Sequence, residues 1–199
     1  TEEYNGSAWT TVNNMTTAGR RNGDAVGILT AGVAFGGNLV PGAFTNATEE
    51  YDGTNWTAGG NLTTARESVS AAGTLTAALA AGGYLGTYSS DVEEYNGTAW
   101  SEVNNLPATR GFGSGSGIQT NALIFAGNAG GLTATALRYD GTNWSTEPSM
   151  STARANTASA QSGTADAALG FSGYTPTSNA TEEFTGDTTA LNIKTFTTS

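Results

Sequence analysis

The sequence predicts an all-β fold built from one repeated antiparallel unit. The motif Tyr-(Asp/Asn)-Gly-x-x-Trp recurs along the chain, and its aromatic position falls at residues 4, 51, 95, 139 and 184. These positions are 47, 44, 44 and 45 residues apart, and a fixed period in this range is typical of repeat architectures. Turn signals recur every eight to twelve residues with no helical period between them, which indicates strands rather than helices.

Each unit can be divided into four strands. In the unit that starts at Arg66, the expected strands are Glu67–Thr74, Ala77–Gly83, Asp91–Tyr95 and Thr98–Val103. Asn96-Gly97 is expected to form a tight hairpin turn, because Asn and Gly tolerate the positive φ that a primed turn needs. Four strands in a unit of about 45 residues are typical of a β-propeller blade.

The repeated residues resemble a kelch repeat over essentially the whole chain. A glycine pair ends the second strand, Tyr precedes the Asp-Gly or Asn-Gly turn, and Trp and Arg follow. The resemblance implies a propeller in which Tyr lies on the third strand of a blade and Trp on the fourth. The glycine pair departs from the pattern at Gly127-Asn128 and at Gly170–Gly173, and Leu137-Arg138 replaces the acidic pair found before the other aromatics.

The blade count predicts a single propeller domain over residues 1–199 whose first blade is incomplete. The expected parts are an outer half-blade at 1–14 and full blades at about 20–61, 66–105, 110–148 and 154–199, the last ending in the strand Leu191–Thr197. We expect a five-bladed ring in which residues upstream of Thr1 supply the inner strands of the first blade. A ring of four, closed by residues 1–14 against the last blade, is the alternative.

Composition excludes several function classes. The 199 residues carry 17 Asp and Glu against 7 Lys and Arg, a net charge of −10, which disfavours nucleic acid and anionic membranes as partners. No apolar run is long enough to span a bilayer, so no membrane insertion is expected. The absence of Cys and His removes disulfides, thiolate chemistry and imidazole metal ligands, and we expect neither a metal site nor another cofactor.

Two sets of repeated residues are interpreted as structural. Trp at one position of every blade is expected to wedge between neighbouring blades, although such rings can also serve as carbohydrate platforms. The tryptophans are Trp9, Trp56, Trp100 and Trp144. One arginine per blade is expected to pair with a buried glutamate, because adjacent glutamates on a strand point to opposite faces. The arginines are Arg20 or Arg21, Arg66, Arg110 and Arg154. A catalytic carboxylate pair is the alternative interpretation of the glutamates.

Candidate ligand-binding residues lie in the loops between second and third strands. These loops differ in length and sequence, whereas the Asp-Gly and Asn-Gly turns on the opposite face are alike. Four aromatic side chains stand among their polar residues: Phe44, Tyr84, Tyr88 and Tyr174. Aromatic anchors among Asn, Ser, Thr and Gly suit adaptable recognition, and solvated connectors are the alternative.

The expected function is non-catalytic binding or a structural role. The Gly-, Ala-, Thr- and Asn-rich blades resemble kelch-like repeats of tailed-phage structural proteins. That resemblance implies a place on the virion surface or a tail fibre, within a larger assembly, with other virion proteins or a host-surface glycan or protein as partners. A secreted bacterial adhesion or glycan-binding propeller, at an extracellular or cell-surface location, is the first alternative, and a glycan-processing enzyme is the second.

Overall fold

The chain folds into antiparallel β-sheets. The computed structural model describes residues 1–161, 163–175, 179–186 and 194–196, and these ranges contain no helix. The all-β prediction is therefore confirmed. Each four-stranded sheet is a meander, in which the strands of that sheet are hydrogen-bonded to one another in chain order.

Among the described residues there are four four-stranded sheets, which we number along the chain. Sheet 1 contains β4 (Asp24–Ile28), β5 (Ala31–Phe35), β8 (Thr48–Tyr51) and β9 (Trp56–Ala58). Sheet 2 contains β10 (Ser70–Thr74), β11 (Ala77–Ala81), β12 (Val92–Tyr95) and β13 (Trp100–Val103). Sheet 3 contains β14 (Ser114–Ile118), β15 (Asn121–Phe125), β16 (Ala136–Tyr139) and β17 (Trp144–Glu147). Sheet 4 contains β18 (Ala158–Ser159), β19 (Ala167–Phe171), β20 (Thr181–Thr185) and β21 (Lys194–Phe196).

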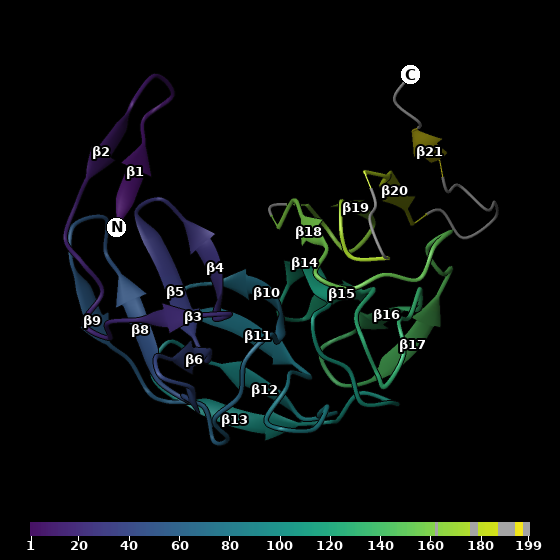
Figure 1. Cartoon of the computed structure of the whole chain (residues 1–199), viewed down its shortest axis with the longest axis horizontal. Coiled ribbons are helices and arrows are strands. Elements are labelled where there is room, and N and C mark those ends of the chain that lie inside the picture. The colour runs from purple at the N-terminus through teal and green to yellow at the C-terminus, as the bar shows by residue number, and fades with distance from the viewer. Residues whose placement is uncertain (162, 176–178, 187–193, 197–199) are drawn as a thin grey trace.

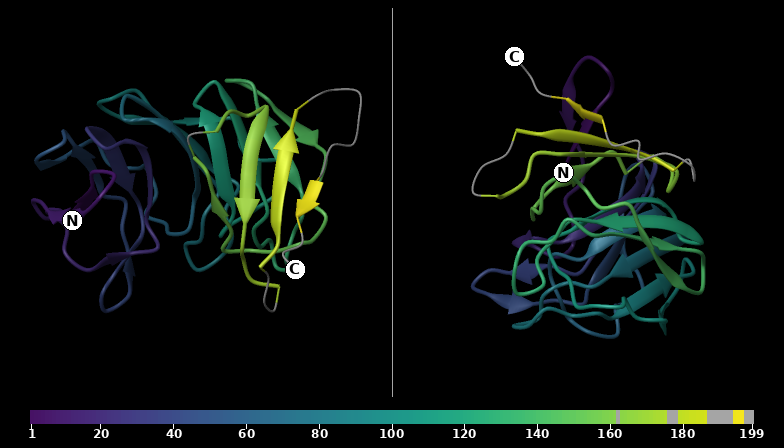
Figure 2. Two further views of the ribbon diagram at one scale, coloured as in Figure 1. Left: turned by 90° about the horizontal axis from the view of Figure 1, so that it is seen from above. Right: turned by 90° about the vertical axis from the view of Figure 1, so that its right-hand side faces the viewer.

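The sheets stand side by side along an open arc (Figure 1). An N-terminal hairpin of β1 (Glu2–Tyr4) and β2 (Trp9–Thr11) lies at one end of the arc, and sheet 4 lies at the other. The first strand of each sheet faces the inside of the arc, where β10 packs against β4 and against β14, and β14 against β18. The view from above shows the same order, from the N-terminal hairpin on the left to sheet 4 on the right (Figure 2, left). The described residues leave a gap between the two ends.

Strand boundaries differ from the expected ones at two repeated positions. The first strand of sheet 2 begins at Ser70 rather than Glu67, because Ser68 takes a left-handed conformation (φ 53°) that interrupts the strand. In sheet 2 both residues of the glycine pair, Gly82 and Gly83, have positive φ. In sheets 3 and 4 the two residues that have positive φ at this place are Ala126-Gly127 and Ser172-Gly173. The assignment of the pair to Gly127-Asn128 is therefore wrong.

The predicted primed turns are also wrong in type. Tyr95 pairs with Trp100, so four residues, Asn96 to Ala99, connect β12 to β13, and only Gly97 among them has positive φ (87°). The Asn96 Oδ1 accepts hydrogen bonds from the backbone N–H groups of Thr98 (3.0 Å) and Ala99 (2.9 Å). Asp52 and Asp140 cap the equivalent loops in the same way. The geometry that these three loops share comes from this side-chain cap, which holds each loop without a second left-handed residue.

A separate three-stranded sheet includes a segment that was expected to be a loop. It pairs β3 (Arg20–Arg21) with β6 (Asn38–Leu39), and β6 with β7 (Ala43–Phe44). These two-residue strands have no alternating pattern of their own, and they form because the segment after Gly37 folds back over the start of sheet 1. The consequence is that Phe44 is held on a short hairpin.

The tryptophans lie where neighbouring units meet. The Trp100 ring of sheet 2 lies edge-on to Phe35 of sheet 1 (4.7 Å between centroids), and its Nε1 donates to Thr48 Oγ1 at 2.9 Å. Trp144 Nε1 donates to the Asn104 carbonyl (2.9 Å), and Trp56 Nε1 to Thr1 Oγ1 (3.1 Å). Trp9, at the end of the arc, is 67% exposed.

The arginine–glutamate pairing is observed in three of the four sheets. Nη2 of Arg20, Arg66 and Arg154 lies 2.9, 3.0 and 2.9 Å from Oε1 of Glu49, Glu93 and Glu182, and all six side chains are buried. Each carboxylate also accepts a backbone N–H from the segment ahead of its arginine, at Thr16 (2.5 Å), Thr63 (2.7 Å) and Ser151 (2.6 Å). The carboxylate thus joins one sheet to the connection that enters it.

Sheet 3 lacks both the carboxylate and the backbone N–H donor of this arrangement. Leu137 occupies the position of Glu93, and Pro107, which has no N–H, occupies the position of Thr63. Leu137 instead packs in an apolar cluster with Leu106 and Ile124. Arg110 remains buried and donates to the Thr135 carbonyl at 2.9 Å, and burial lowers its pKa to about 10. The loss of the acceptor and the loss of its donor therefore occur together.

A second series of hydrogen bonds links each sheet to the one before it. The hydroxyl groups of Tyr51, Tyr95 and Tyr139 donate to Glu3, Glu50 and Glu94 of the preceding unit. At the next boundary Phe184 replaces Tyr and Arg138 replaces Glu. Arg138 pairs there with Glu147 (2.9 Å) of its own sheet and with Asp166 (2.7 Å) of sheet 4. Donor and acceptor again change together across one interface.

Candidate ligand-binding face

Three of the four aromatic candidates come together in one cluster. Tyr84 is its centre: its ring centroid lies 6.0 Å from Phe44, 5.4 Å from Tyr88 and 6.1 Å from Phe112. Tyr88 and Phe112 are 6.4 Å apart. All four side chains are partly exposed, and they come from the β6–β7 hairpin, the β11–β12 loop and the segment before β14. We call these four residues the aromatic cluster.

The position of Phe112 follows from a repeated backbone feature. Asn22, Ser68, Phe112 and Asn156 each stand two residues after the arginine of their unit, and each has a positive φ, of 52°, 53°, 60° and 53°. Their backbones form a chain in which the N–H of each one donates to the carbonyl of the residue one unit earlier, at 2.8, 2.9 and 2.8 Å. We call these residues the inner rim. The inner rim lies where the inside of the arc meets the face that carries the loops between second and third strands, which we call the loop face.

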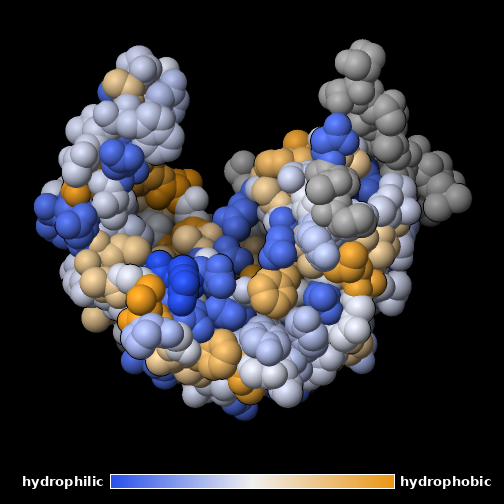
Figure 3. Space-filling view, viewed as in Figure 1, coloured by the Kyte–Doolittle hydropathy of each residue, from blue (hydrophilic) through white to orange (hydrophobic). Residues whose placement is uncertain are grey.

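A polar hollow of about 210 Å³ opens at the inner rim. It is lined by the rim residues and by Asp24, Val69 and Thr157, so the segments that lead into all four sheets contribute to it. The space-filling view shows hydrophilic residues gathered on this inner side of the arc (Figure 3). Amide and hydroxyl groups from several units can donate hydrogen bonds to one ligand and accept hydrogen bonds from it.

Asp24 is the acidic residue of the hollow. Its Oδ1 accepts hydrogen bonds from the Ala25 backbone N–H (2.9 Å) and from Gln161 Nε2 (3.3 Å). Gln161 follows β18, so this contact links sheet 4 to sheet 1 across the inside of the arc. Burial raises the pKa of Asp24 to about 6, and the two hydrogen bonds oppose that shift.

Tyr174 lies outside the aromatic cluster. It occupies the repeat position of Tyr84, since both residues form an isolated bridge to the segment before their sheet, but sheet 3 lies between them and presents Asn128 at that position. Tyr174 is 58% exposed. The loop Tyr174–Ala180 also includes residues 176–178, which are outside the described residues.

Sequence reasoning missed Phe112, Asp24 and the rim. Phe112 is the one aromatic residue in Gly111–Gly117, a segment that otherwise contains only Gly and Ser, and it belongs to none of the second-to-third-strand loops. A signal was present: the residue two places after each arginine aligns in all four units as Asn, Ser, Phe and Asn. A bulky Phe with positive φ is unusual, so its backbone state could not be expected from residue type.

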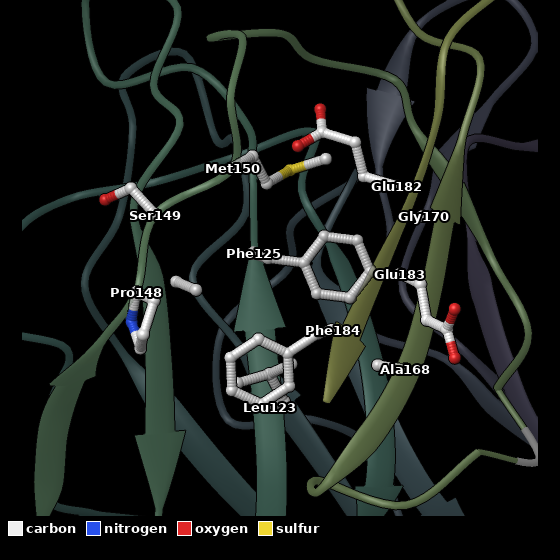
Figure 4. Close-up of a pocket in the computed structure, with 11 residues that line it drawn as sticks. Leu123, Phe125, Pro148, Ser149, Met150, Ala168, Gly170, Glu182, Glu183 and Phe184 are labelled. Atoms are coloured by element: carbon white, nitrogen blue, oxygen red, sulfur yellow. The ribbon is translucent and has the colours of Figure 1, made fainter. Parts of the chain in front are cut away.

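An apolar pocket between sheets 3 and 4 is part of the core. Figure 4 shows the rings of Phe125 and Phe184 in it beside Leu123, with Met150 above and the Glu183 carboxylate pointing away. Its volume of about 30 Å³ leaves room for roughly one water molecule. The pocket therefore offers no space for an organic ligand.

Two further kinds of feature are absent from the described ranges. They contain no group of three or more carboxylates that could hold a metal ion. They also contain no helix of the length and apolarity that a membrane crossing needs. No protein-family model matches the sequence, and no curated protein matches it.

Proposed function

We propose that this chain forms blades of a five-bladed, kelch-like β-propeller that binds a ligand at its loop face without chemical turnover. The observation that carries the proposal is the aromatic cluster, because three separate segments bring partly exposed rings together beside a polar hollow. Rings next to amide and hydroxyl groups suit a glycan, whose apolar faces stack and whose hydroxyls form hydrogen bonds.

The proposed setting is the surface or tail fibre of a tailed phage, where the ligand is a host-surface glycan and the neighbours are other virion proteins. This setting rests on the resemblance of the repeats, and the open inner side of the arc is compatible with contacts to a larger assembly. The same site would serve a secreted adhesion module, so copurification with phage particles distinguishes the two settings.

The test is a glycan array followed by titration with two matched variants. Tyr84→Ala removes the centre of the aromatic cluster, and Tyr174→Ala removes a tyrosine from the same repeat position outside it. We expect Tyr84→Ala to weaken binding at least about tenfold, as loss of a central aromatic contact does, and Tyr174→Ala to leave affinity within about twofold.

Phe44→Ala, at the edge of the aromatic cluster, provides a second variant in case Tyr84→Ala disturbs the loops. Circular dichroism and Tm verify that each variant is folded. Equal losses for Tyr84→Ala and Tyr174→Ala would refute the loop-face site. Release of a shortened glycan on prolonged incubation would favour the enzyme alternative.

A further inference from the structure

The inner edge of β1 has no strand beside it. β8, β12 and β16 occupy the same repeat position, and each pairs with a strand on both edges, whereas β1 pairs with β2 alone. The Thr1 carbonyl accepts from Val12 N and Asn5 N donates to the Ala8 carbonyl, so alternation turns the N–H and C=O groups of Glu2 and Tyr4 to the other edge. In the described residues these groups face an open edge.

The surface beside this edge is apolar and open. Tyr4 is 49% exposed and Trp9 is 67% exposed, while the equivalent Tyr95 and Trp100 are 0% and 6% exposed. A hollow of about 310 Å³ lies between the N-terminal hairpin and β4, lined by Glu2, Val26, Ile28 and residues near them, and by Gln161 after β18. Ile28 is 71% exposed. Bare apolar surface next to an unpaired edge is typical of a site that another strand covers.

The inner strand of sheet 1 lacks the cover that the next inner strands have. β10 packs against β4, and β14 packs against β10. Ala71 of β10 and Gly115 of β14 are buried by this stacking, but Ala25 at the same position in β4 is exposed. One further inner strand, placed before β4, would continue an interface that already repeats along the arc.

Charge adds a specific requirement. Glu2 occupies the repeat position of Glu49, Glu93 and Glu182, each of which forms an ion pair with a buried arginine. Within the ranges that the structure describes, no cation pairs with Glu2. An occupant that buries this edge would therefore also have to bring an arginine, because a buried carboxylate without a cation is costly.

We propose that the inner edge of β1 binds a two-stranded β-hairpin of the repeat's own inner-strand type, whose leading arginine pairs with Glu2. The registers of the other sheets define its second strand. This strand carries a small residue opposite Tyr, then an aliphatic residue opposite the second acidic position, then a variable residue opposite the first acidic position. Its last residue lies opposite the residue that precedes the acidic pair. The observed examples are Gly32–Phe35, Ala78–Ala81 and Ala122–Phe125.

The occupant is a hairpin that is not already part of a sheet. The hairpins β4–β5, β10–β11 and β14–β15 have the required pattern, but each is paired with its own third strand. A second copy of the chain would have to open a four-stranded sheet to supply one. Self-association is therefore the competing outcome, and the test separates it.

The probe is a synthetic peptide with the sequence of Arg66–Asp91, added to the full chain. Hydrogen exchange followed by NMR reports the Tyr4 amide, which faces the open edge, and the Asn5 amide, which already bonds to Ala8, is the internal control. We expect the peptide to slow exchange at Tyr4 at least about tenfold and to leave Asn5 nearly unchanged. Trp9 fluorescence should shift to shorter wavelength.

A charge exchange tests the proposed ion pair. The Arg66→Glu peptide should lose most of its effect on the wild-type chain and regain it on the Glu2→Arg variant. A copy of Arg66–Asp91 fused directly before Thr1 provides a second format if the free peptide aggregates, and the same slowing at Tyr4 is expected.

Three results would overturn the proposal. The first is unchanged exchange at Tyr4 with both the peptide and the fusion. The second is equal binding by the Arg66 and Arg66→Glu peptides. The third is slow exchange at Tyr4 without peptide that depends on protein concentration, which would identify a second copy as the occupant.

Discussion

Replacement of Glu93 by leucine would test whether the buried ion pairs hold the sheets together. In the wild-type chain Glu93 accepts the Thr63 N–H at 2.7 Å and lies 3.0 Å from Arg66 Nη2, and both charged side chains are completely buried. Leucine is the residue that sheet 3 carries at this position, so its shape is compatible with the fold. Among the described residues, the substitution leaves Arg66 with one ion pair, to Asp91, which is 3.8 Å away and 43% exposed, and with the more distant carboxylate of Glu102.

The expected loss is large for one substitution. Removal of one partner from a buried ion pair costs about 3–5 kcal/mol, because the other charge stays buried. The Thr63 N–H loses its acceptor as well, at about 1–3 kcal/mol, and the added apolar burial of leucine offsets about 1.5–3 kcal/mol. We expect the free energy of unfolding to fall by about 3–5 kcal/mol, which lowers Tm by on the order of 10 °C in a chain of this size.

Urea unfolding and calorimetry measure the effect, and Glu2→Leu is the matched control. Glu2 has the same repeat position but is exposed and has no arginine partner in the described residues. Glu2→Leu should therefore lower the free energy of unfolding by no more than about 0.5 kcal/mol. Arg66→Met combined with Glu93→Leu should recover at least half of the stability, because an apolar pair can replace a buried ion pair. Equal small losses at Glu93 and Glu2 would refute the reasoning.

Two further substitutions probe the packing and the hollow. Trp100→Ala should lower the free energy of unfolding by about 3–5 kcal/mol, as loss of a buried large ring does, while Trp9→Ala should cost under about 1 kcal/mol, and similar losses at both would contradict the interface role. Because the pKa of Asp24 is raised to about 6, its protonated form favours folding. The unfolding free energy of wild type relative to Asp24→Asn should therefore fall as pH rises from about 4 to about 7, measured by urea titrations, and a pH-independent difference would contradict the shifted pKa.

The period predicted most of the fold. It located the strands and their order, because side-chain alternation and turn residues recur in each unit. It also predicted that an arginine of each blade pairs with a buried glutamate, because a strand that carries two adjacent glutamates must turn one inward. Which of the two glutamates pairs, as Glu93 does with Arg66, comes from the structure. The left-handed conformation of Ala126 and Ser172 was missed, because glycine is the usual residue in that conformation. Neither Ala nor Ser indicates a positive φ by its residue type.

The candidate site was harder to predict than the fold. Phe44, Tyr84 and Tyr88 lie in the loops that the sequence indicates, but their convergence with Phe112 depends on contacts between segments far apart in sequence. The separation of Tyr174 from them has the same origin, because its place is set by the sheet that carries it. A repeat pattern describes one unit at a time, and a site that spans units depends on how they are placed.

The paired substitutions at the boundaries limit how the repeats could be rearranged. A unit with Tyr on its leading face needs a unit with Glu before it, and the unit that carries Phe184 instead follows the one that carries Arg138. Exchange of whole units between the first positions would keep every donor opposite an acceptor. A crossover that placed Arg138 before a tyrosine-bearing unit would leave the hydroxyl facing a cation. The order of the last two units is therefore under tighter constraint in recombination than the order of the earlier ones.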